Sequence, residues 1–224
     1  MKDELGQSEA VLEVPRFAPN FERYQRIARL YDILDAPFEY GRYRRIRPLL
    51  FNGLSGRILE AGIGTGRNVR FYPQDAWVVG IDLSPAMLAR ATLRVKASPC
   101  PVALINMDVT RLSFPDSCFD GAVATFLFCV LPEQLQVLAL SELGRVVKTG
   151  GTIRLLEYVR PRRIIRRLIA KLWEPWIAWA YGASFDHQTE AHVAGAGLDL
   201  VDTRFVIDDL VKLISLRVPR ARLA

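Results

Sequence analysis

The chain has 224 residues, of which 50% are hydrophobic, and it carries a formal net charge of +6. This length and composition favour one folded domain with a sizeable core and exclude a largely disordered chain. No stretch approaches the roughly 18 consecutive apolar residues that a membrane-spanning helix needs. The first residues lack the apolar core of a secretory signal, and Cys100, Cys118 and Cys129 form no C-x-x-C pair. We therefore expect a cytoplasmic protein without disulfides or a metal site.

The charges are unevenly distributed along the chain. Residues 1–15 are rich in acids and predict a mobile tail, whereas basic residues gather in 16–57 and again in 160–171. The second group contains six basic side chains and no acid: Arg160, Arg162, Arg163, Arg166, Arg167 and Lys171. A block of this kind can contact nucleic acid, an anionic membrane or an acidic substrate.

Residues 16–50 predict helices that precede the first strand. Aromatic and aliphatic side chains recur there at helical spacing: Phe21, Tyr24, Ile27, Ala28 and Tyr31. Pro37 interrupts this pattern, and we expect a second helix over residues 40–50.

The sequence RILEAGIGTGRN at 57–68 carries the strongest signal. Ile58 and Leu59 predict a short buried strand, after which a tight turn leads to the start of a helix. The turn contains three glycines, namely Gly62, Gly64 and Gly66. Because glycine lacks a Cβ and tolerates positive φ, this backbone can approach a ligand closely. A dinucleotide site has the spacing G-x-G-x-x-G. Here the spacing is E-x-G-x-G-x-G, and the Glu60 carboxylate suits a cation or an amino group better than a pyrophosphate.

A second buried strand, at 77–82, ends in Asp82. In open α/β sheets, ligands bind at the carboxyl ends of the strands, where Asp82 is expected to lie. Ser84 and Pro85 are the residue types preferred at the N-cap and the first position of a helix, so a helix is predicted from Pro85 to about Lys96.

These features resemble the class I S-adenosylmethionine-dependent methyltransferases over roughly residues 40–215. The resemblance implies that the glycine loop wraps the methionine part of the cofactor and that Asp82 binds the ribose hydroxyls. It also implies that Met87 lies near the adenine and that Asp108 meets the adenine amino group. The full set of residues expected at the cofactor is Glu60, Ala61, Gly62, Gly64, Thr65, Gly66, Asn68, Asp82, Leu83, Met87, Asp108, Val109, Thr125 and Phe126. The alternative is a Rossmann-like fold that binds NAD or no cofactor.

The rest of the chain continues the alternation of strands and helices. Strands are predicted at 102–107, 122–126, 152–158, 200–207 and 212–218, and helices at 133–147 and 189–197. Asp120, in the loop before the fourth strand, is expected to be structural rather than catalytic. The resemblance implies an α/β, Rossmann-like sheet of seven mostly parallel strands with helices on both faces and an antiparallel last strand. We expect an acidic tail (1–15) and one domain (16–224), comprising a helical cap (16–50), a cofactor-binding core (51–160) and a basic helix with the final hairpin (161–224).

The segment RVVKTGG at 145–151, followed by Leu156 and Glu157, is similar to a narrower group of methyltransferases. This group comprises the enzymes of ubiquinone and menaquinone synthesis and the bacterial phospholipid N-methyltransferases. Thr149 replaces the usual proline, which leaves the substrate open.

Residues 162–181 predict an amphipathic helix with basic residues opposite an apolar stripe, kinked at Pro175. The stripe consists of Ile164, Ile165, Leu168, Ile169, Leu172, Trp173 and Trp176. Such a helix can lie on an anionic membrane, with Arg162, Arg163, Arg166, Arg167, Lys171, Trp173 and Trp176 as the contacts. Alternatively, the apolar stripe packs on the sheet or covers the substrate pocket.

Methyl transfer depends mainly on proximity and orientation, which can be worth about 7–11 kcal/mol, so the absence of an obvious catalytic dyad does not exclude an enzyme. The candidates for accepting the proton of the nucleophile are Tyr24, Tyr31, Tyr158 and His187. We expect a methyltransferase, peripheral on the inner face of the membrane, that uses S-adenosyl-L-methionine and acts on a lipophilic acceptor. The leading acceptor is an amine-bearing phospholipid such as phosphatidylethanolamine.

Three alternatives to this function remain open. They are C-methylation of a quinone precursor, methylation of a small apolar thiol or amine, and a non-catalytic, cofactor-binding protein that tethers a partner to the membrane. A nucleic-acid substrate is disfavoured, because FLFC at 126–129 lacks the N/D-P-P-Y/F motif of the base-modifying amino methyltransferases.

Overall fold

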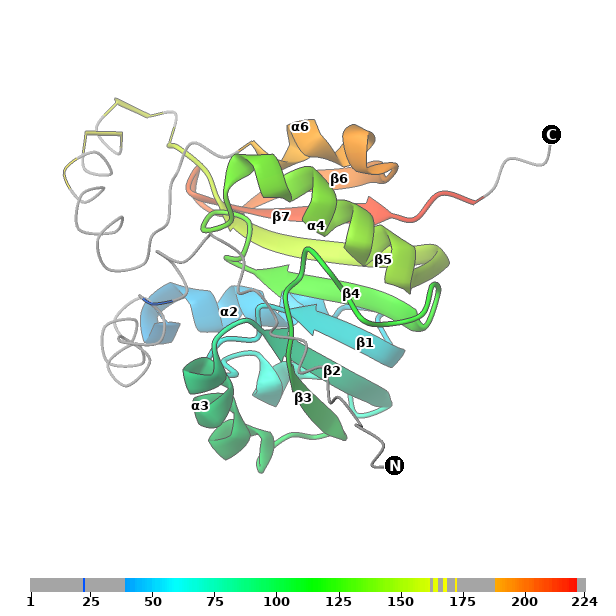
Figure 1. Ribbon diagram of the computed structural model, residues 1–224. Coiled ribbons are helices and arrows are strands. Elements are labelled where there is room, and N and C mark those ends of the chain that lie inside the picture. Colours follow the sequence, from blue (N-terminus) through cyan, green and yellow to red (C-terminus); the bar gives the residue numbers. More distant parts are fainter. Residues whose placement is uncertain are drawn as a thin grey trace, which may run out of the picture.

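The computed structural model describes residues 22, 39–161, 163–164, 167–168, 172 and 188–220. Its centre is a seven-stranded sheet in the order β3-β2-β1-β4-β5-β7-β6 (Figure 1). The strands are β1 (Gly56–Ala61), β2 (Ala76–Asp82), β3 (Val102–Asn106), β4 (Phe119–Thr125), β5 (Val147–Tyr158), β6 (Asp199–Ile207) and β7 (Val211–Arg217). The helical elements are η1 (Glu39–Tyr43), α2 (Arg44–Ile46), η2 (Arg47–Leu50), η3 (Val69–Phe71), α3 (Pro85–Val95), α4 (Glu133–Val146), α6 (Thr189–Val193) and η4 (Ala194–Ala196).

The first five strands pair in parallel, whereas β7 runs antiparallel to both β5 and β6. This arrangement confirms the predicted mostly parallel sheet with an antiparallel last strand. Because strands β1 to β5 are parallel, their carboxyl ends meet at one edge of the sheet, and the loops that follow them gather there. A site at this edge is therefore built from segments that are far apart in the sequence.

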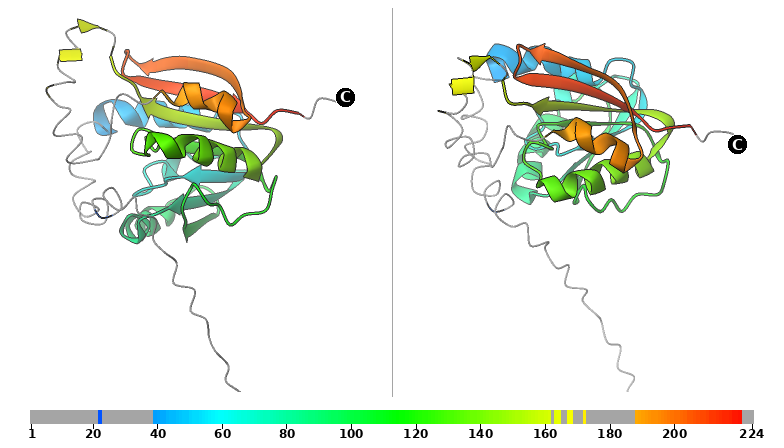
Figure 2. Two further views of the ribbon diagram at one scale, coloured as in Figure 1. Left: turned by 45° about the horizontal axis from the view of Figure 1, so that its top comes forward. Right: turned by 90° about the horizontal axis from the view of Figure 1, so that it is seen from above.

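Helical elements cover both faces of the sheet. Figure 2 shows α4 and α6 on one face and the segment of residues 39–50 on the other. Successive residues of a strand point to opposite faces, so Leu59 and Val79 join the core under α4, whereas their neighbours Ile58 and Val78 join the core under residues 39–50. The near-continuous apolar sequence of the central strands follows from this double covering.

The segment of residues 39–50, called the cap below, is helical as predicted, but it passes through three helix types. A π-helical turn, one α-helical turn and a 3₁₀ turn follow one another in η1, α2 and η2. Pro48 is the second residue of η2, so its missing N–H coincides with the change from the α-helical to the 3₁₀ turn. Of the helix predicted ahead of Pro37, the structure describes Glu22, which is helical.

The helix α3 begins as its sequence predicts. The Ser84 hydroxyl accepts a hydrogen bond from the Met87 amide, and Pro85 occupies the first turn. By contrast, the prediction that a helix starts at the glycine loop is wrong, because only the three-residue 3₁₀ helix η3 follows the loop. Tyr72 is extended ahead of Pro73, as residues before proline usually are, and this ends the helical turn.

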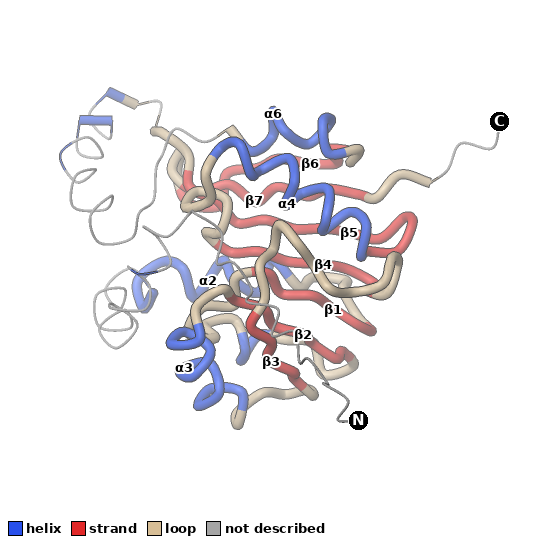
Figure 3. Tube along the Cα trace, in the orientation of Figure 1, coloured by secondary structure: helices blue, strands red, loops and turns tan. Residues whose placement is uncertain are grey.

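The connection from β3 to β4 contains neither helix nor strand (Figure 3). Arg145 on α4 holds it, donating hydrogen bonds to the carbonyl oxygens of Leu112 and Phe114 at 2.8 Å each and forming an ion pair with Asp116. The predicted loop before the fourth strand is thus confirmed, and it is fixed from the helix that follows.

Candidate cofactor site

The three glycines of the 62–66 loop all have left-handed backbone conformations. The φ angles are +69° at Gly62, +56° at Gly64 and +80° at Gly66. A Cβ at Gly62 would lie 3.0 Å from Leu127 Cδ1, and one at Gly66 would lie 3.2 Å from Ala91 Cα. A Cβ at Gly64 would meet no described atom within 4 Å. The loop is therefore packed at both ends and open at its middle glycine, which is the shape a bound cofactor requires.

Asp82 at the end of β2 lies directly against this loop. Its Oδ2 accepts a hydrogen bond from the Gly64 amide at 2.8 Å, and its Oδ1 accepts one from the Ser84 amide at 2.9 Å. Burial raises the pKa of Asp82 to about 6, although these two hydrogen bonds act in the opposite direction. The acid that the sequence assigns to the ribose and the loop assigned to the methionine part are thus in contact.

Glu60 lies beneath the loop rather than on its open side. Its Oε1 accepts a hydrogen bond from Asn68 Nδ2 at 2.7 Å, and its Oε2 accepts one from the Tyr72 hydroxyl. Burial raises the pKa of Glu60 to about 7, against the lowering effect of these hydrogen bonds. Both carboxylate oxygens are thus bonded inside the protein, and the expected contact of Glu60 with the cofactor stays a prediction.

The remaining residues assigned to the cofactor surround the ends of β1, β2 and β3. Ala61, Thr65, Met87 and Val109 are buried, Asp108 is partly buried and Leu83 is exposed. Asp108 Oδ1 accepts hydrogen bonds from the Thr110 amide and hydroxyl at 2.8 Å each. Asn106, which sequence analysis missed, donates to the carbonyl oxygens of Asp82 and Leu83 at 2.9 and 2.8 Å. It therefore fixes the two peptide groups that follow Asp82, the expected ribose contact.

At the end of β4, Thr125 and Phe126 adjoin the loop. Thr125 Oγ1 accepts a hydrogen bond from Asn68 Nδ2 at 2.9 Å. Phe126 has a left-handed φ of 54°, which is unusual for a residue with a side chain. The turn that follows is held by Glu157, whose carboxylate accepts the amides of Leu127, Phe128 and Cys129 at 3.0–3.1 Å.

Sequence analysis named Glu157 as part of the pattern shared with a narrower group of methyltransferases, but assigned it no role. Its side chain is almost fully buried, and this burial raises its pKa to about 7.

Asp120, at the opposite edge of the sheet, accepts hydrogen bonds from the Arg57 amide and from Lys148 Nζ at 2.7 and 2.6 Å. These contacts fit the expected structural role of Asp120.

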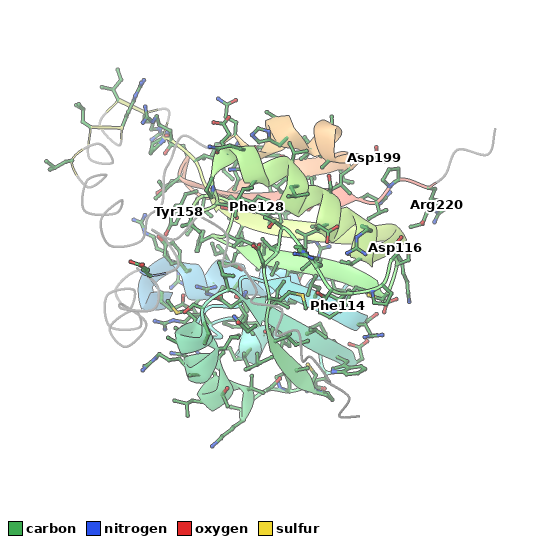
Figure 4. All side chains as sticks on the ribbon, viewed as in Figure 1. Phe114, Asp116, Phe128, Tyr158, Asp199 and Arg220 are labelled. Carbon is green, nitrogen blue, oxygen red and sulfur yellow. The ribbon has the colours of Figure 1, made fainter. Side chains whose placement is uncertain are left out.

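Tyr158 at the end of β5 is the one described residue among the predicted proton acceptors. It lies at the edge of the sheet away from Asp116 (Figure 4). Its ring stacks on Phe126 with centroids 4.4 Å apart, and its hydroxyl donates to the Tyr43 hydroxyl at 2.5 Å. Tyr43 also contacts Phe126, with centroids 5.2 Å apart. Sequence analysis did not single out Tyr43, because no motif marks it.

Other predicted residues cannot be placed. Tyr24, Tyr31 and His187 lie outside the described residues, as do Arg162, Ile165, Arg166, Ile169, Lys171, Trp173 and Trp176. Within the described part of the chain, no group of His, Cys, Asp and Glu side chains could hold a metal ion. In the same part, no helix is both long enough and apolar enough to cross a bilayer.

Comparison with known proteins agrees with this geometry. A family profile described as "Methyltransferase domain" matches residues 58–151, which include the glycine loop and Asp82. The chain belongs to the class I S-adenosylmethionine-dependent methyltransferases, and S-adenosyl-L-methionine is its cofactor.

Two curated methyltransferases are similar to this chain in sequence. The chain is 36% identical over 166 residues to the phosphatidylethanolamine N-methyltransferase of Cereibacter sphaeroides, covering 70% of this chain and 77% of that enzyme. It is 34% identical over 148 residues to the ubiquinone/menaquinone biosynthesis C-methyltransferase UbiE of Syntrophotalea carbinolica, covering 62% of this chain and 60% of that enzyme.

A solved structure shares the fold. The N-methyltransferase NodS of Bradyrhizobium japonicum superposes with a TM-score of 0.61 at 18% identity, covering 83% of this chain and 99% of that one.

Proposed function

We propose that the protein transfers the methyl group of S-adenosylmethionine to the amine of a phospholipid such as phosphatidylethanolamine. The observation that carries this proposal is the aromatic cluster of Tyr43, Phe126 and Tyr158, in a chain related to a phosphatidylethanolamine N-methyltransferase. Aromatic faces attract alkylammonium groups by cation–π interaction, worth about 0.5–2 kcal/mol each.

The position of the cluster suits an acceptor site. Phe126 directly follows Thr125, which is hydrogen-bonded to Asn68 just beyond the glycine loop. Tyr158 ends the neighbouring strand, and Tyr43 approaches from the cap. An amine bound against these rings therefore lies beside the cofactor loop, at the edge of the sheet where class I enzymes carry out their chemistry.

The division of labour among the residues follows from these positions. The bound cofactor supplies a methyl group already activated by a positively charged sulfur. The glycine loop holds its methionine part, Asp82 holds its ribose hydroxyls, and Met87 and Asp108 lie on the adenine side. The ammonium of the acceptor must lose a proton before its nitrogen can attack the methyl carbon. That proton is taken up by water, and the Tyr158 hydroxyl, which donates to the Tyr43 hydroxyl, accepts a hydrogen bond from the nitrogen of the acceptor and orients it.

A membrane surface is the proposed location of the acceptor. Ile164, Leu168 and Leu172 are spaced four residues apart and are 76%, 64% and 80% exposed. Arg163 and Arg167 beside them are also exposed, and the Arg167 amide donates to the Arg163 carbonyl as in a helix. Basic residues near an anionic bilayer contribute about 1 kcal/mol each, and the apolar side chains can enter the headgroup region. This pattern favours docking on an anionic membrane over a lid packed against the protein.

C-methylation of a quinone precursor is the second candidate, because the chain is also similar to quinone C-methyltransferases. Methylation of a small apolar thiol or amine is a further possibility, since the aromatic cluster would admit either. A non-catalytic membrane tether is opposed by the retained glycine loop and by the contact of Asp82 with Gly64.

The deciding experiment offers radiolabelled S-adenosylmethionine and separate acceptor pools to the purified protein. The pools are total lipid extract, quinone precursors, small thiols and amines, and tRNA. We expect label in methylated derivatives of phosphatidylethanolamine, and we expect the label to be lost in Asp82→Ala. Label found only in the quinone fraction would replace the proposal by its second candidate, and no transfer to any pool would favour the tether.

Membrane docking is tested by co-sedimentation with vesicles of phosphatidylcholine containing increasing phosphatidylglycerol. Arg163→Gln with Arg167→Gln should reduce pelleting, whereas Arg111→Gln with Arg217→Gln, two exposed arginines elsewhere on the domain, should not. Pelleting that is independent of phosphatidylglycerol, or equally reduced in both pairs, would contradict the docking surface.

A further inference from the structure

A buried chain of polar side chains joins the cap to the glycine loop. Arg47 and Glu39, both in the cap, are almost fully buried and form a bidentate ion pair, with Arg47 Nη2 2.7 Å from Glu39 Oε2 and Arg47 Nε 3.1 Å from Glu39 Oε1. The third nitrogen of the guanidinium, Nη1, points away from the cap and donates a hydrogen bond to Asn68 Oδ1 at 2.9 Å. The guanidinium thus has one side bound to its own segment and the other bound to the loop.

Asn68 is the point at which three elements meet. Its Oδ1 accepts from Arg47, while its Nδ2 donates to Glu60 Oε1 on β1 and to Thr125 Oγ1 on β4. A flipped amide would direct N–H groups at the guanidinium and an oxygen at the Glu60 carboxylate. Arg47 and Glu60 therefore permit only one orientation of this side chain, and that orientation holds the backbone two residues beyond Gly66.

The charges make this connection sensitive to the cap. A buried guanidinium needs its hydrogen-bonding partners, because an unpaired buried charge is strongly unfavourable. If the cap leaves the sheet, Arg47 leaves with it, and Asn68 and Glu60 lose the positive charge that faces them. The shape of the loop and the docking of the cap therefore depend on the same hydrogen bond.

We propose that Arg47 is a positioning residue that couples docking of the cap, residues 39–50, to the cofactor-binding shape of the glycine loop. Cofactor binding then strengthens cap docking and cap docking strengthens cofactor binding, by the same factor. Because Tyr43 belongs to the cap, the cofactor would in this way also complete the aromatic cluster. The inference depends on the cofactor site and not on the phospholipid acceptor, so it can fail or succeed independently of the proposed substrate.

Arg154 provides a matched control. It donates from Nη1 to the carbonyl oxygens of Leu50 and Asn52 at 3.0 and 2.5 Å, and so holds the end of the same cap to β5. Neither of these hydrogen bonds involves the glycine loop. A residue that only stabilises the docked cap should behave like Arg154, whereas a residue that positions the loop should also change cofactor binding.

The experiment compares the wild type with Arg47→Met, Arg47→Lys and Arg154→Met. Affinity for S-adenosylhomocysteine is measured by calorimetry, and cap docking is measured as the rate of tryptic cleavage after the exposed Arg44 and Arg45, with and without S-adenosylhomocysteine. In the wild type we expect the ligand to slow this cleavage about fivefold or more. In Arg47→Met we expect about tenfold weaker binding and loss of the protection.

The other variants separate positioning from simple stabilisation. Arg154→Met should be cleaved faster than the wild type yet bind S-adenosylhomocysteine within about twofold of it. Arg47→Lys keeps the charge without the planar fork, so its affinity should fall between those of the wild type and Arg47→Met. Once an acceptor is known, Arg47→Met should raise KM for S-adenosylmethionine while leaving kcat at saturation nearly unchanged. If Arg47→Met does not fold, Glu39→Gln should show the same effects in weaker form.

Two results would overturn the inference. One is an Arg47→Met protein that binds S-adenosylhomocysteine as the wild type does and remains protected by it. The other is an equal loss of affinity in Arg47→Met and Arg154→Met, since Arg47 would then act only by holding the cap in place.

Discussion

Gly64 is the position where the cofactor site can be tested most directly. It has a left-handed φ of +56°, and an added Cβ would meet no described atom within 4 Å. Gly64→Ala should therefore cost only the strain of a left-handed alanine, about 1–2 kcal/mol of the free energy of unfolding. If the loop wraps the cofactor, the same methyl group occupies space that the cofactor needs, and binding should weaken by far more than the strain predicts.

Gly53 is the matched control for this substitution. Its φ is +70°, its Cβ would also meet nothing within 4 Å, and it lies before β1, at the edge of the sheet opposite the site. Gly53→Ala and Gly64→Ala should therefore lose similar free energies of unfolding in urea denaturation. Only Gly64→Ala should bind S-adenosylhomocysteine at least about tenfold more weakly in calorimetry, which corresponds to about 1.4 kcal/mol. Equal binding by the two variants would refute the argument that the open side of the loop faces the cofactor.

Three further results follow from the buried carboxyl groups. Asp82→Asn should bind S-adenosylhomocysteine about tenfold more weakly in calorimetry and lose about 1–3 kcal/mol of unfolding free energy, because an amide can accept only one of the two hydrogen bonds that the carboxylate accepts from Gly64 and Ser84. Glu157→Leu leaves three buried amides without an acceptor, so it should lose at least about 3 kcal/mol in urea denaturation, and Glu157→Gln should lose less. The raised pKa values of Glu60 and Glu157, both about 7, mean that the folded state binds more protons than the unfolded state between about pH 5 and 7. The free energy of unfolding, measured in urea, should therefore fall as the pH rises through this window, by up to about 3 kcal/mol for each group.

Each of these expectations has a clear opposite. A loss well above about 3 kcal/mol in Asp82→Asn, with unchanged cofactor binding, would mean that its charge serves the fold rather than the cofactor. A Glu157→Leu variant as stable as the wild type would mean that the turn after β4 finds other acceptors. Stability that rises between pH 5 and 7 would contradict the burial of both glutamates, since Asp120 and Glu142, whose pKa values are lowered, titrate mainly below this range.

The parts of the fold that sequence analysis placed correctly are those governed by local rules. The strand ending at Asp82 and the helix beginning after Ser84 were predicted to within one residue, whereas β5 begins five residues before its predicted start at Thr152. Hydrophobic periodicity and capping act over a few positions, so the sequence displays them directly. The glycine spacing likewise identified the loop and, through resemblance, the cofactor.

Local rules also explain the error after the glycine loop. A glycine turn followed by a helix is the usual pattern, but here Pro73 forces Tyr72 into an extended conformation and leaves room for only η3. The membrane-binding segment, Tyr24, Tyr31 and His187 remain predictions.

By itself, the sequence determined the class of the protein, because the elements of the cofactor loop are neighbours in the chain. Only the tertiary structure decided how the loop is held and what lies beside it. Arg47 meets Asn68 across 21 positions, Glu157 meets Leu127 across 30, and Tyr43 meets Tyr158 across 115. Such pairs leave no periodic trace in the sequence, because parallel strands bring distant segments to one edge of the sheet only when the whole domain is folded.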